Sequence, residues 1–494
     1  MTRLVAAWLT PALLLGVPSA LIAEGRDGLW VALLFVIAPL VAASTAVSRR
    51  AAWPEVGRRT FPLVAMLLVV GLLLWANLSL AGDVASWMGQ PRWRGILPAV
   101  VALAGLLWPR AARAWRWLVP AGLLALVLPV AVVVHASHTD PIATWSQVAS
   151  QPAFRFGAGS PWVTEGRALG LRSRPQALSF EEEHRVTPLD PGPVRVEVRD
   201  QGRLQVQEWT LVPGQSVTLR PGDRLQVDHE MRLKFEADKR VPGAPLSGIA
   251  WADASPFPRG VMLIRLFGLA LTLVGGAVGL VGFAAPTAPT RASVGLGGLV
   301  LLLSLGWAEC WAIYAARWAP ELFVGGVSAA ALVELPALLL RPSPWGPRLA
   351  GVGLAGLVAL FLAASVALRE QLAMAEGEEG GPLESDAGLW GGVFAVTALA
   401  ALWPVEPWSL VLTALGLGAS TVAPLIFLGM PTGRPAAAAW AVGVGLALFL
   451  GLTALGRLGV QGGSVGQTLL TYPALVATPV AGSILWVARR PARP

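Results

Sequence analysis

Residues 61–81 read FPLVAMLLVVGLLLWANLSLA and contain no charged side chain. A helix that crosses a lipid bilayer needs about 20 consecutive, mostly apolar residues, so this stretch predicts a membrane-spanning helix. The rest of the chain has the same character, because 55% of its 494 residues are hydrophobic and only 13% are charged. Soluble domains carry roughly 25% charged residues. The sequence therefore predicts a polytopic α-helical protein embedded in a lipid bilayer.

Twelve further segments resemble this one in length and hydrophobicity. They are 4–23, 29–47, 95–109, 117–135, 260–284, 293–316, 322–340, 349–368, 389–403, 406–429, 436–456 and 468–488. Segments 95–109 and 389–403 are short for a span, so we expect 12–13 spans. The first segment lacks the small-residue cleavage pattern of a signal peptide before Glu24, and we expect it to remain as a helix.

One polar window, residues 136–258, interrupts the apolar sequence and contains both lysines, Lys234 and Lys239. Apolar and polar residues alternate along it, and this spacing is typical of strands that bury one face. The apolar positions are Val194, Val196 and Val198, then Leu204 and Val206, Val217 and Leu219, Leu225 and Val227, and Met231, Leu233 and Phe235. We therefore expect a small all-β domain, a sandwich or open barrel of at least five antiparallel strands.

These patterns divide the chain into three parts. We expect an N-terminal membrane bundle of about five helices over 1–135 and a C-terminal bundle of about seven or eight over 259–494. The extramembrane β domain, 136–258, lies between them. Its Pro- and Gly-rich flanks, 140–190 and 238–258, are predicted to be extended connectors.

Arginine positions predict the orientation. The net charge of +8 does not indicate nucleic-acid binding, because arginines cluster at the ends of apolar segments, as in 49–59 and 110–116. Positive charge there marks cytoplasmic loops, which places the β domain outside. We expect a bacterial inner-membrane protein with a periplasmic β domain. Thirteen spans would put Arg489, Arg490 and Arg493 outside, so either a later segment does not cross or the tail is an exception.

Three ionisable residues fall within predicted spans: Arg265, Glu309 and Glu334. A charge at the centre of a membrane costs about 2.5–3.5 kcal/mol on insertion scales, so it normally finds a partner. Arg265 and Glu309 lie at similar depths on consecutive antiparallel segments, which favours an ion pair. The alternative is a proton or ion relay that includes Glu334, two residues before Pro336.

His135, His138 and Asp140 form the one pattern that suggests a metal ion. Positions three apart share a helix face, so both imidazoles would reach one ion. The alternative is that these histidines lie at a polar interface and bind nothing. We expect no cofactor: the single cysteine, Cys310, excludes a redox pair, and no P-loop sequence or deeply placed intramembrane histidine occurs. No arrangement of residues predicts a catalytic site.

Two functions remain in view, and neither is enzymatic. The first is a membrane subunit or assembly scaffold whose β domain docks a periplasmic or membrane protein through strand edges in 194–236. The second is a transporter or permease for a small solute, ion or lipid-linked substrate. Pro336, Pro424 and Pro473 would break helices that line such a path. A membrane enzyme would need an outward acid or base, for which Glu309, Glu321 and Asp140 are present but not arranged.

Overall fold

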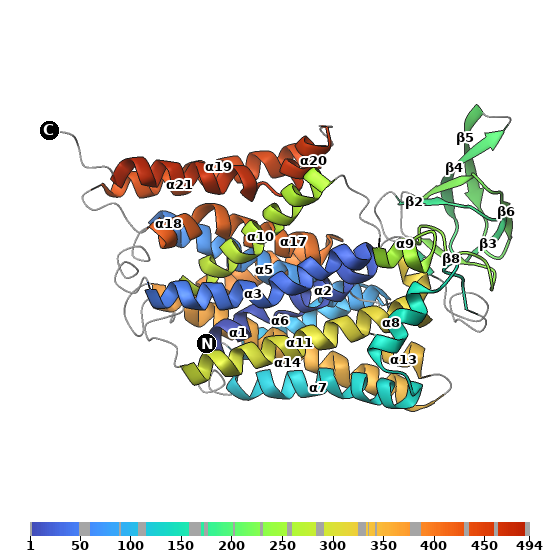
Figure 1. Cartoon of the computed structure of the whole chain (residues 1–494), viewed down its shortest axis with the longest axis horizontal. Helices are drawn as coiled ribbons and strands as arrows, with labels where there is room; N and C mark the ends of the chain where they lie inside the picture. Colours follow the sequence, from blue (N-terminus) through green and yellow to red (C-terminus); the bar gives the residue numbers. More distant parts are fainter. Residues whose placement is uncertain are drawn as a thin grey trace.

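The computed structural model contains a helical bundle with a β region at one end (Figure 1). Elements are numbered along the chain. The structure describes residues 2–48, 60–87, 90–106, 115–157, 169–171, 176–200, 203–227, 231–253, 259–282, 291–324, 332–333, 335–340, 343–375, 387–428, 434–458 and 463–489.

Within these residues, eight helical segments are long and apolar enough to cross a membrane. They are α3 (Gly28–Ser48), α5 (Thr60–Trp87), α7 (Trp115–Ser137), α10 (Arg259–Gly282), α11 (Arg291–Trp318), α14 (Trp345–Ala375), α17 (Pro407–Thr421) with α18 (Ala423–Leu428), and α19 (Pro435–Arg457). A ninth would be the pair α20 (Ser464–Thr471) and α21 (Ala474–Arg489), which is bent by 68°. Three shorter apolar helices accompany them: α2 (Pro11–Glu24), α6 (Trp93–Leu106) and α16 (Ala387–Ala401).

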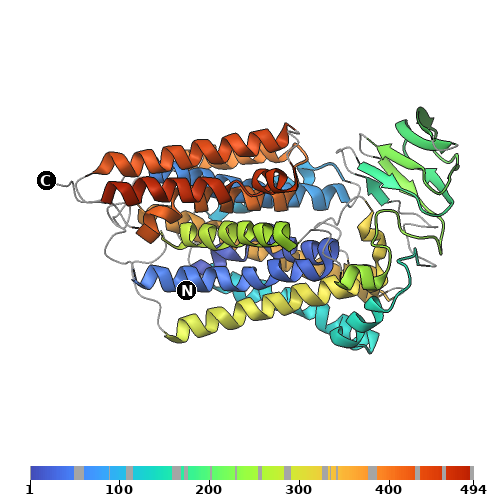
Figure 2. The same ribbon diagram turned by 45° about the horizontal axis from the view of Figure 1, so that its top comes forward.

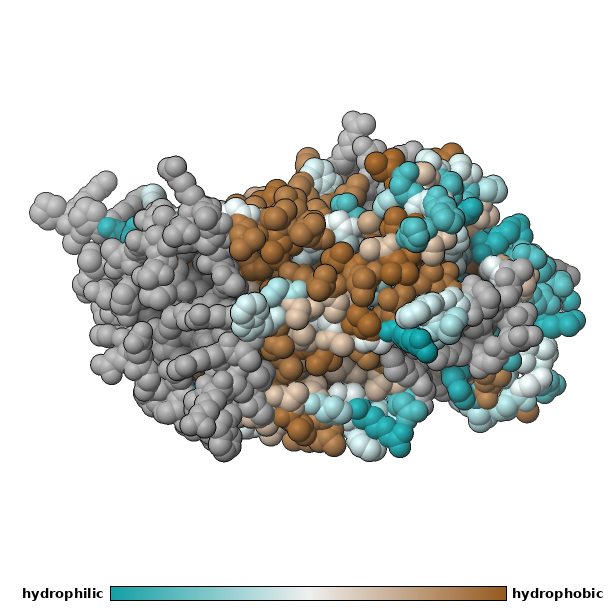
Figure 3. Space-filling model, turned by 90° about the horizontal axis from the view of Figure 1, so that it is seen from below, coloured by the Kyte–Doolittle hydropathy of each residue, from teal (hydrophilic) through white to brown (hydrophobic). Residues whose placement is uncertain are grey.

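The side view in Figure 2 shows these helices running roughly parallel to one long direction. Figure 3 shows hydrophobic residues across the middle of the bundle on the face that is seen, with polar residues gathered toward the β end. Helices from both sides of the insertion pack together, since α14 lies along α7, α10 along α3, and α17 along α5. These features suggest a multi-pass membrane protein.

The first predicted segment, 4–23, is a broken helix. It forms α1 (Thr2–Trp8) and α2, separated by Leu9 and Thr10. The break exposes backbone amides that a continuous helix would pair, and the side chain of Asn77 accepts one of them, from Ala12, at 3.0 Å. Helix α2 is buried among α3, α5, α11, α14 and α17, as expected for a helix that is apolar on all sides.

The predicted span 322–340 is wrong for its described residues. A 3-10 turn, η4 (Pro320–Phe323), and the short helix α13 (Leu335–Leu339) occupy its two ends. Both lie at the β end: the ring of Phe323 is 5.1 Å from that of Phe154, and Ala337 packs against Gly346 at the start of α14. A five-residue helix is far shorter than a bilayer requires. The described ends of this segment therefore lie at one end of the bundle.

Because the described ends of segment 322–340 lie at the β end, the helix that follows it, α14, starts from that end. Helix α14 runs away from the β region, and α21 ends at the opposite end of the bundle, as the C-terminus in Figure 1 shows. The described ends of α3, α5 and α7 that flank 49–59 and 107–114 lie at that same far end. The end of α21 therefore lies at the same end of the bundle as the described helix ends that flank 49–59 and 107–114.

Eight short strands form two antiparallel sheets, as the alternation predicts. One sheet has the order β1-β8-β3-β6 and the other β2-β7-β4-β5. The strands are β1 (Leu169–Leu171), β2 (Gln176–Ser179), β3 (His184–Pro188), β4 (Gly192–Asp200), β5 (Arg203–Leu211), β6 (Val217–Leu219), β7 (Arg224–Val227) and β8 (Met231–Lys234). All five apolar alternations of the sequence correspond to strands β4–β8.

Two expectations about this region need correction. The flanks are not merely extended connectors, because they contain β1–β3 and the helices α8 (Pro141–Ala149) and α9 (Gly248–Asp253). Val206 does not face the core: it is 61% exposed, because the register pairs it with Glu197 and not with a buried valine. Alternation finds a strand, but the partner strand decides which face is buried.

The two connectors between bundle and sheets pair with each other and form a stalk, residues 154–156 with 238–241. Phe156 N–H donates to the Lys239 carbonyl at 2.8 Å, and Val241 N–H donates to Phe154 at 2.9 Å. Below the stalk, the rings of Trp145 on α8 and Trp251 on α9 are 4.7 Å apart. The indole of Trp251 donates to the Ile22 carbonyl at the end of α2. The β region is thus anchored on the bundle.

Candidate functional site

The structure places the two residues of the predicted pair on helices that share few contacts. Arg265 lies on α10 and Glu309 on α11, and no hydrogen bond or salt bridge between these two described residues is present. Helix α3 packs against both helices and separates them (Figures 1 and 2). Consecutive helices are not always neighbours, which sequence order alone does not reveal. Glu334 lies outside the described residues.

The structure brings His135 and His138 near one another and gives the Asp140 carboxylate a separate role. Helix α7 ends at Ser137, so His138 lies beyond it with a φ of 52°, and the two imidazole centroids are 6.2 Å apart. An Asp140 carboxylate oxygen caps α8 by accepting the Ala143 N–H at 2.7 Å. Among the residues that the structure describes, no group of three or more histidine, cysteine or acidic side chains is placed to hold a metal ion.

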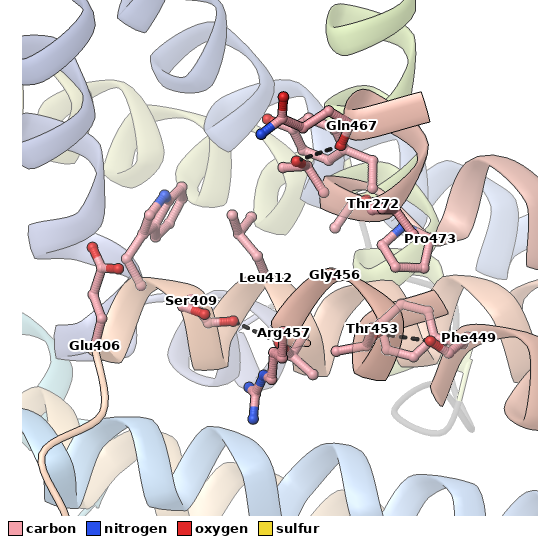
Figure 4. A pocket seen from close by; sticks show the side chains of 15 residues that line it. Thr272, Glu406, Ser409, Leu412, Phe449, Thr453, Gly456, Arg457, Gln467 and Pro473 are labelled. Carbon is pink, nitrogen blue, oxygen red and sulfur yellow. Dashed lines mark hydrogen bonds between the residues drawn. The ribbon is translucent and has the colours of Figure 1, made fainter. Parts of the chain in front are cut away.

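A pocket of about 530 Å³ lies where α17 begins, α19 ends and α20 turns into α21 (Figure 4). It is at the end of the bundle that carries the β region. Its lining residues include Thr272, Glu406, Trp408, Ser409, Thr413, Phe449, Thr453, Arg457, Gln467, Thr471, Tyr472 and Pro473. Drug-sized ligand pockets in proteins have volumes of roughly 300–1,000 Å³, so this space is large enough for a small molecule or a lipid head group.

Several hydroxyl groups line this pocket, and their protons are already engaged. Thr413 donates to the Ser409 carbonyl at 2.7 Å, Thr453 to Phe449 at 2.8 Å, and Thr471 to Gln467 at 2.8 Å. A hydroxyl that donates to its own helix retains oxygen lone pairs that accept hydrogen bonds. The pocket wall therefore offers acceptors.

The second candidate surface is the free edge of β5. The other strands that end a sheet are β1, β2 and β6, each of three or four residues, whereas β5 has nine. Long edges expose a row of unpaired backbone groups that pair readily with another chain. The end of the β4–β5 hairpin also extends beyond β7, which pairs only with residues 195–197 of β4 (Figure 1).

A third cluster ties the β-side ends of helices together. Arg92, in the α5–α6 connection, forms a salt bridge with Asp83 on α5 and donates to the Ala401 carbonyl of α16 at 3.0 Å. It also donates to the Ser79 hydroxyl at 3.1 Å, and that hydroxyl donates to the Val405 carbonyl at 3.0 Å. The hydrogen bonds of this cluster join α5, α16 and the chain that follows α16, so we interpret it as structural.

No protein family and no curated protein matches this sequence. Functional assignments therefore rest on geometry. Sequence reasoning missed the pocket, although Pro473 gave a partial signal as a helix-breaking residue. Ser409 and Thr413, four residues apart, were the other available signal, because that spacing places both on one face of a helix.

Proposed function

We propose that this protein is a non-enzymatic membrane subunit or assembly scaffold whose β region docks an extended segment of a partner protein along β5. The observation that carries this proposal is the outer edge of the nine-residue strand β5, which pairs with no second strand among the described residues and lies at the end of the molecule farthest from the bundle. A partner strand added there would gain main-chain hydrogen bonds, the mode of recognition called β-augmentation.

The register supports this use of the edge. Asp200 pairs with Arg203 across a two-residue connection, so alternate residues from Arg203 onward bond to β4. Residues 204, 206, 208 and 210 then direct their amides toward the open side. Val206 is 61% exposed, and it offers an incoming strand an apolar side chain. The stalk and the tryptophan contacts would hold this edge at a fixed orientation.

Blocking the edge is expected to abolish docking. A photo-crosslinking amino acid at Glu208 should give one discrete adduct in native membranes. Val206→Pro removes one outward N–H without touching the β4–β5 ladder, and the adduct should disappear. Val206→Thr keeps the amide and should keep the adduct. Persistence of the adduct in the proline variant, or an equal adduct from the exposed Thr218 of β6, would argue against β5 as the docking strand.

We also propose a bacterial inner-membrane location with the β region in the periplasm. Arginines in the far-end connections and tail outnumber those near the β end outside the polar window. In the sequence, the far-end termini of α3, α5, α6, α7, α11, α19 and α21 are flanked by Arg49, Arg50, Arg58, Arg59, Arg110, Arg113, Arg116, Arg291, Arg434, Arg489, Arg490 and Arg493; the β-end termini are flanked by Arg26, Arg92, Arg94, Arg259, Arg317, Arg341, Arg348 and Arg457. An arginine excess is typical of the cytoplasmic side.

Cysteine labelling tests this orientation. In a Cys310→Ala background, a cysteine at exposed Ser216 should react with a membrane-impermeant maleimide in intact cells whose outer membrane has been opened. A cysteine at exposed Arg434, near Ala488 at the far end, should react only after lysis. The reverse pattern would invert the orientation, and labelling of both from outside would refute the assignment of spans.

Transport is the second candidate, and broken helices favour it. Breaks occur between α1 and α2 and between α20 and α21. In many transporters, discontinuous helices of this kind line the substrate site. A transport path requires access from both sides, so cysteines at Thr453 and Thr413 would have to react with reagents added on either side of the membrane. Reaction from the β side alone would exclude this function.

A further inference from the structure

We propose that the pocket between α17, α19 and α20 binds a zwitterion, with an ammonium group held by oxygen acceptors and aromatic rings and an anionic group held by Arg457 at the rim. This inference is independent of docking at β5, because the two surfaces share no residue.

The inner wall of the pocket offers mainly hydrogen-bond acceptors. Thr413, Thr453 and Thr471 have committed their protons to helix carbonyls, so their oxygens face a ligand as acceptors. Glu406 adds a carboxylate to the lining. Figure 4 shows Thr453 and Phe449 at one end of the pocket, and Glu406 at the other. A group rich in donors and without acceptors, such as an ammonium, complements this wall.

Helix ends of both kinds reach the pocket, because α17 begins there while α19 and α20 end there. Helices α19 and α20 both contribute residues of their C-terminal turns, Gly456 and Arg457 from one and Leu470 and Thr471 from the other. The C-terminal end of a helix carries a partial negative charge. Pro473 has no N–H, so the Leu469 carbonyl lacks the amide that a continuous helix would supply. The bend between α20 and α21 thus falls at the end of α20, whose last turn lines the pocket.

Aromatic side chains complete the site for a cation. Trp408, Phe449 and Tyr472 line the pocket, and a cation over an aromatic face gains from the ring quadrupole. Trp408 is held in place, because its ring packs directly on Gly16 of α2, where even a methyl group would overlap it.

The rim provides the opposite charge. Arg457 is exposed at the end of α19, and Gln467, also exposed, lies across the opening on α20. Guanidinium and amide donors suit a phosphate or carboxylate. The ligand is therefore a zwitterion such as phosphoethanolamine, either as a lipid head group or as a free molecule. A volume of about 530 Å³ accommodates both.

Calorimetric titration of the full chain in an uncharged maltoside detergent tests the site. Dioctanoyl-phosphatidylethanolamine should bind, and dioctanoyl-phosphatidylglycerol, which lacks the ammonium, should bind at least about tenfold more weakly. Titration with free phosphoethanolamine distinguishes a lipid head group from a soluble molecule as the ligand. Binding as tight as the lipid assigns the site to a soluble zwitterion, whereas much weaker binding assigns it to a lipid head group. Equal affinity for both lipids would overturn the proposal.

Two variants locate the binding. Thr453→Val removes an acceptor while keeping the shape, and Arg457→Gln removes the rim charge; each should weaken the preferred ligand by about tenfold. Thr421→Val is the matched control, since Thr421 makes the same bond to its own α17 helix, to the Leu417 carbonyl, but does not line the pocket. Thr413→Val serves as a second acceptor variant. Unchanged affinity in both folded threonine variants would also overturn the proposal.

Discussion

Replacing Arg92 with methionine is expected to lower the free energy of unfolding by about 3–5 kcal/mol, the cost of leaving one member of a buried ion pair without its partner. The Asp83 side chain is 9% exposed and that of Arg92 is 16% exposed, so water cannot replace the lost guanidinium. The Ala401 carbonyl and the Ser79 hydroxyl would also lose the donors that Arg92 gives them.

A second substitution separates the ion pair from its surroundings. Asp83→Leu in the Arg92→Met chain removes the orphan carboxylate and should recover a substantial part of the loss, because a well-packed apolar pair is often no less stable than a buried salt bridge. Arg94→Met is the matched control, since Arg94 is exposed and its loss should cost at most about 0.5 kcal/mol. Reversible unfolding in mixed detergent measures the free energy of unfolding of the wild type and of these three variants. Equal stability of Arg92→Met and Arg94→Met would contradict the structural role of the cluster.

Acidification is expected to destabilise the β region through His184. This residue is 1% exposed and lies edge-on to Phe156, Phe180 and Phe235. Within the described part of the chain, its Nδ1 has no hydrogen-bond partner. Burial lowers the pKa of His184; Lys239 lowers it further, while Glu182, Glu236 and the Arg240 backbone oppose the shift.

The direction of the pH effect follows from that lowered pKa. Above the pKa of the unfolded chain, about 6.5, the ring is neutral in both states and stability is complete. As the pH falls below it, the unfolded chain takes up the proton first, and stability is lost down to the folded pKa. At pH 5 the loss would reach at most about 2 kcal/mol, from roughly 1.36 kcal/mol for each unit of pH.

Hydrogen exchange of the full chain in detergent measures this effect. Peptides covering β3 and β7 should lose protection between pH 7.5 and pH 5, after correction for intrinsic exchange. His184→Leu should remove most of that dependence, while His135→Leu, at an exposed position of α7, should leave it unchanged. Identical pH profiles for wild type and His184→Leu would mean that another group titrates.

Local patterns predicted strands β4–β8 and most of the long helices of this chain. Val194, Val196 and Val198 alternate so regularly that a strand was the only reasonable expectation, and β4 spans them. The apolar stretch at 61–81 lies within α5. Such features depend on a residue and its near neighbours, which a sequence displays directly.

Features that depend on distant partners were not predictable. Segment 322–340 has the composition of a span, yet its described ends stay at one end of the bundle, because Phe323 and Ala337 find partners there. The same limit applies to helix neighbours: α10 and α11 are consecutive in the sequence, but each packs more closely against α3 than against the other. The pocket draws on α10, α17, α19, α20 and α21, and no local pattern brings those five together.

The paired stalk has a consequence for how the chain is assembled. Gly248 N–H donates to the Gln151 carbonyl at 2.8 Å, so the residues on either side of the β region meet as closely as two neighbours in a hairpin. Because the two segments of the stalk lie side by side, a tight turn between them would be long enough to replace the sheets and keep the chain continuous. We therefore expect that another fold could replace the β region if its two chain ends lie at the same spacing, because the packing of the helices beneath would not need to change.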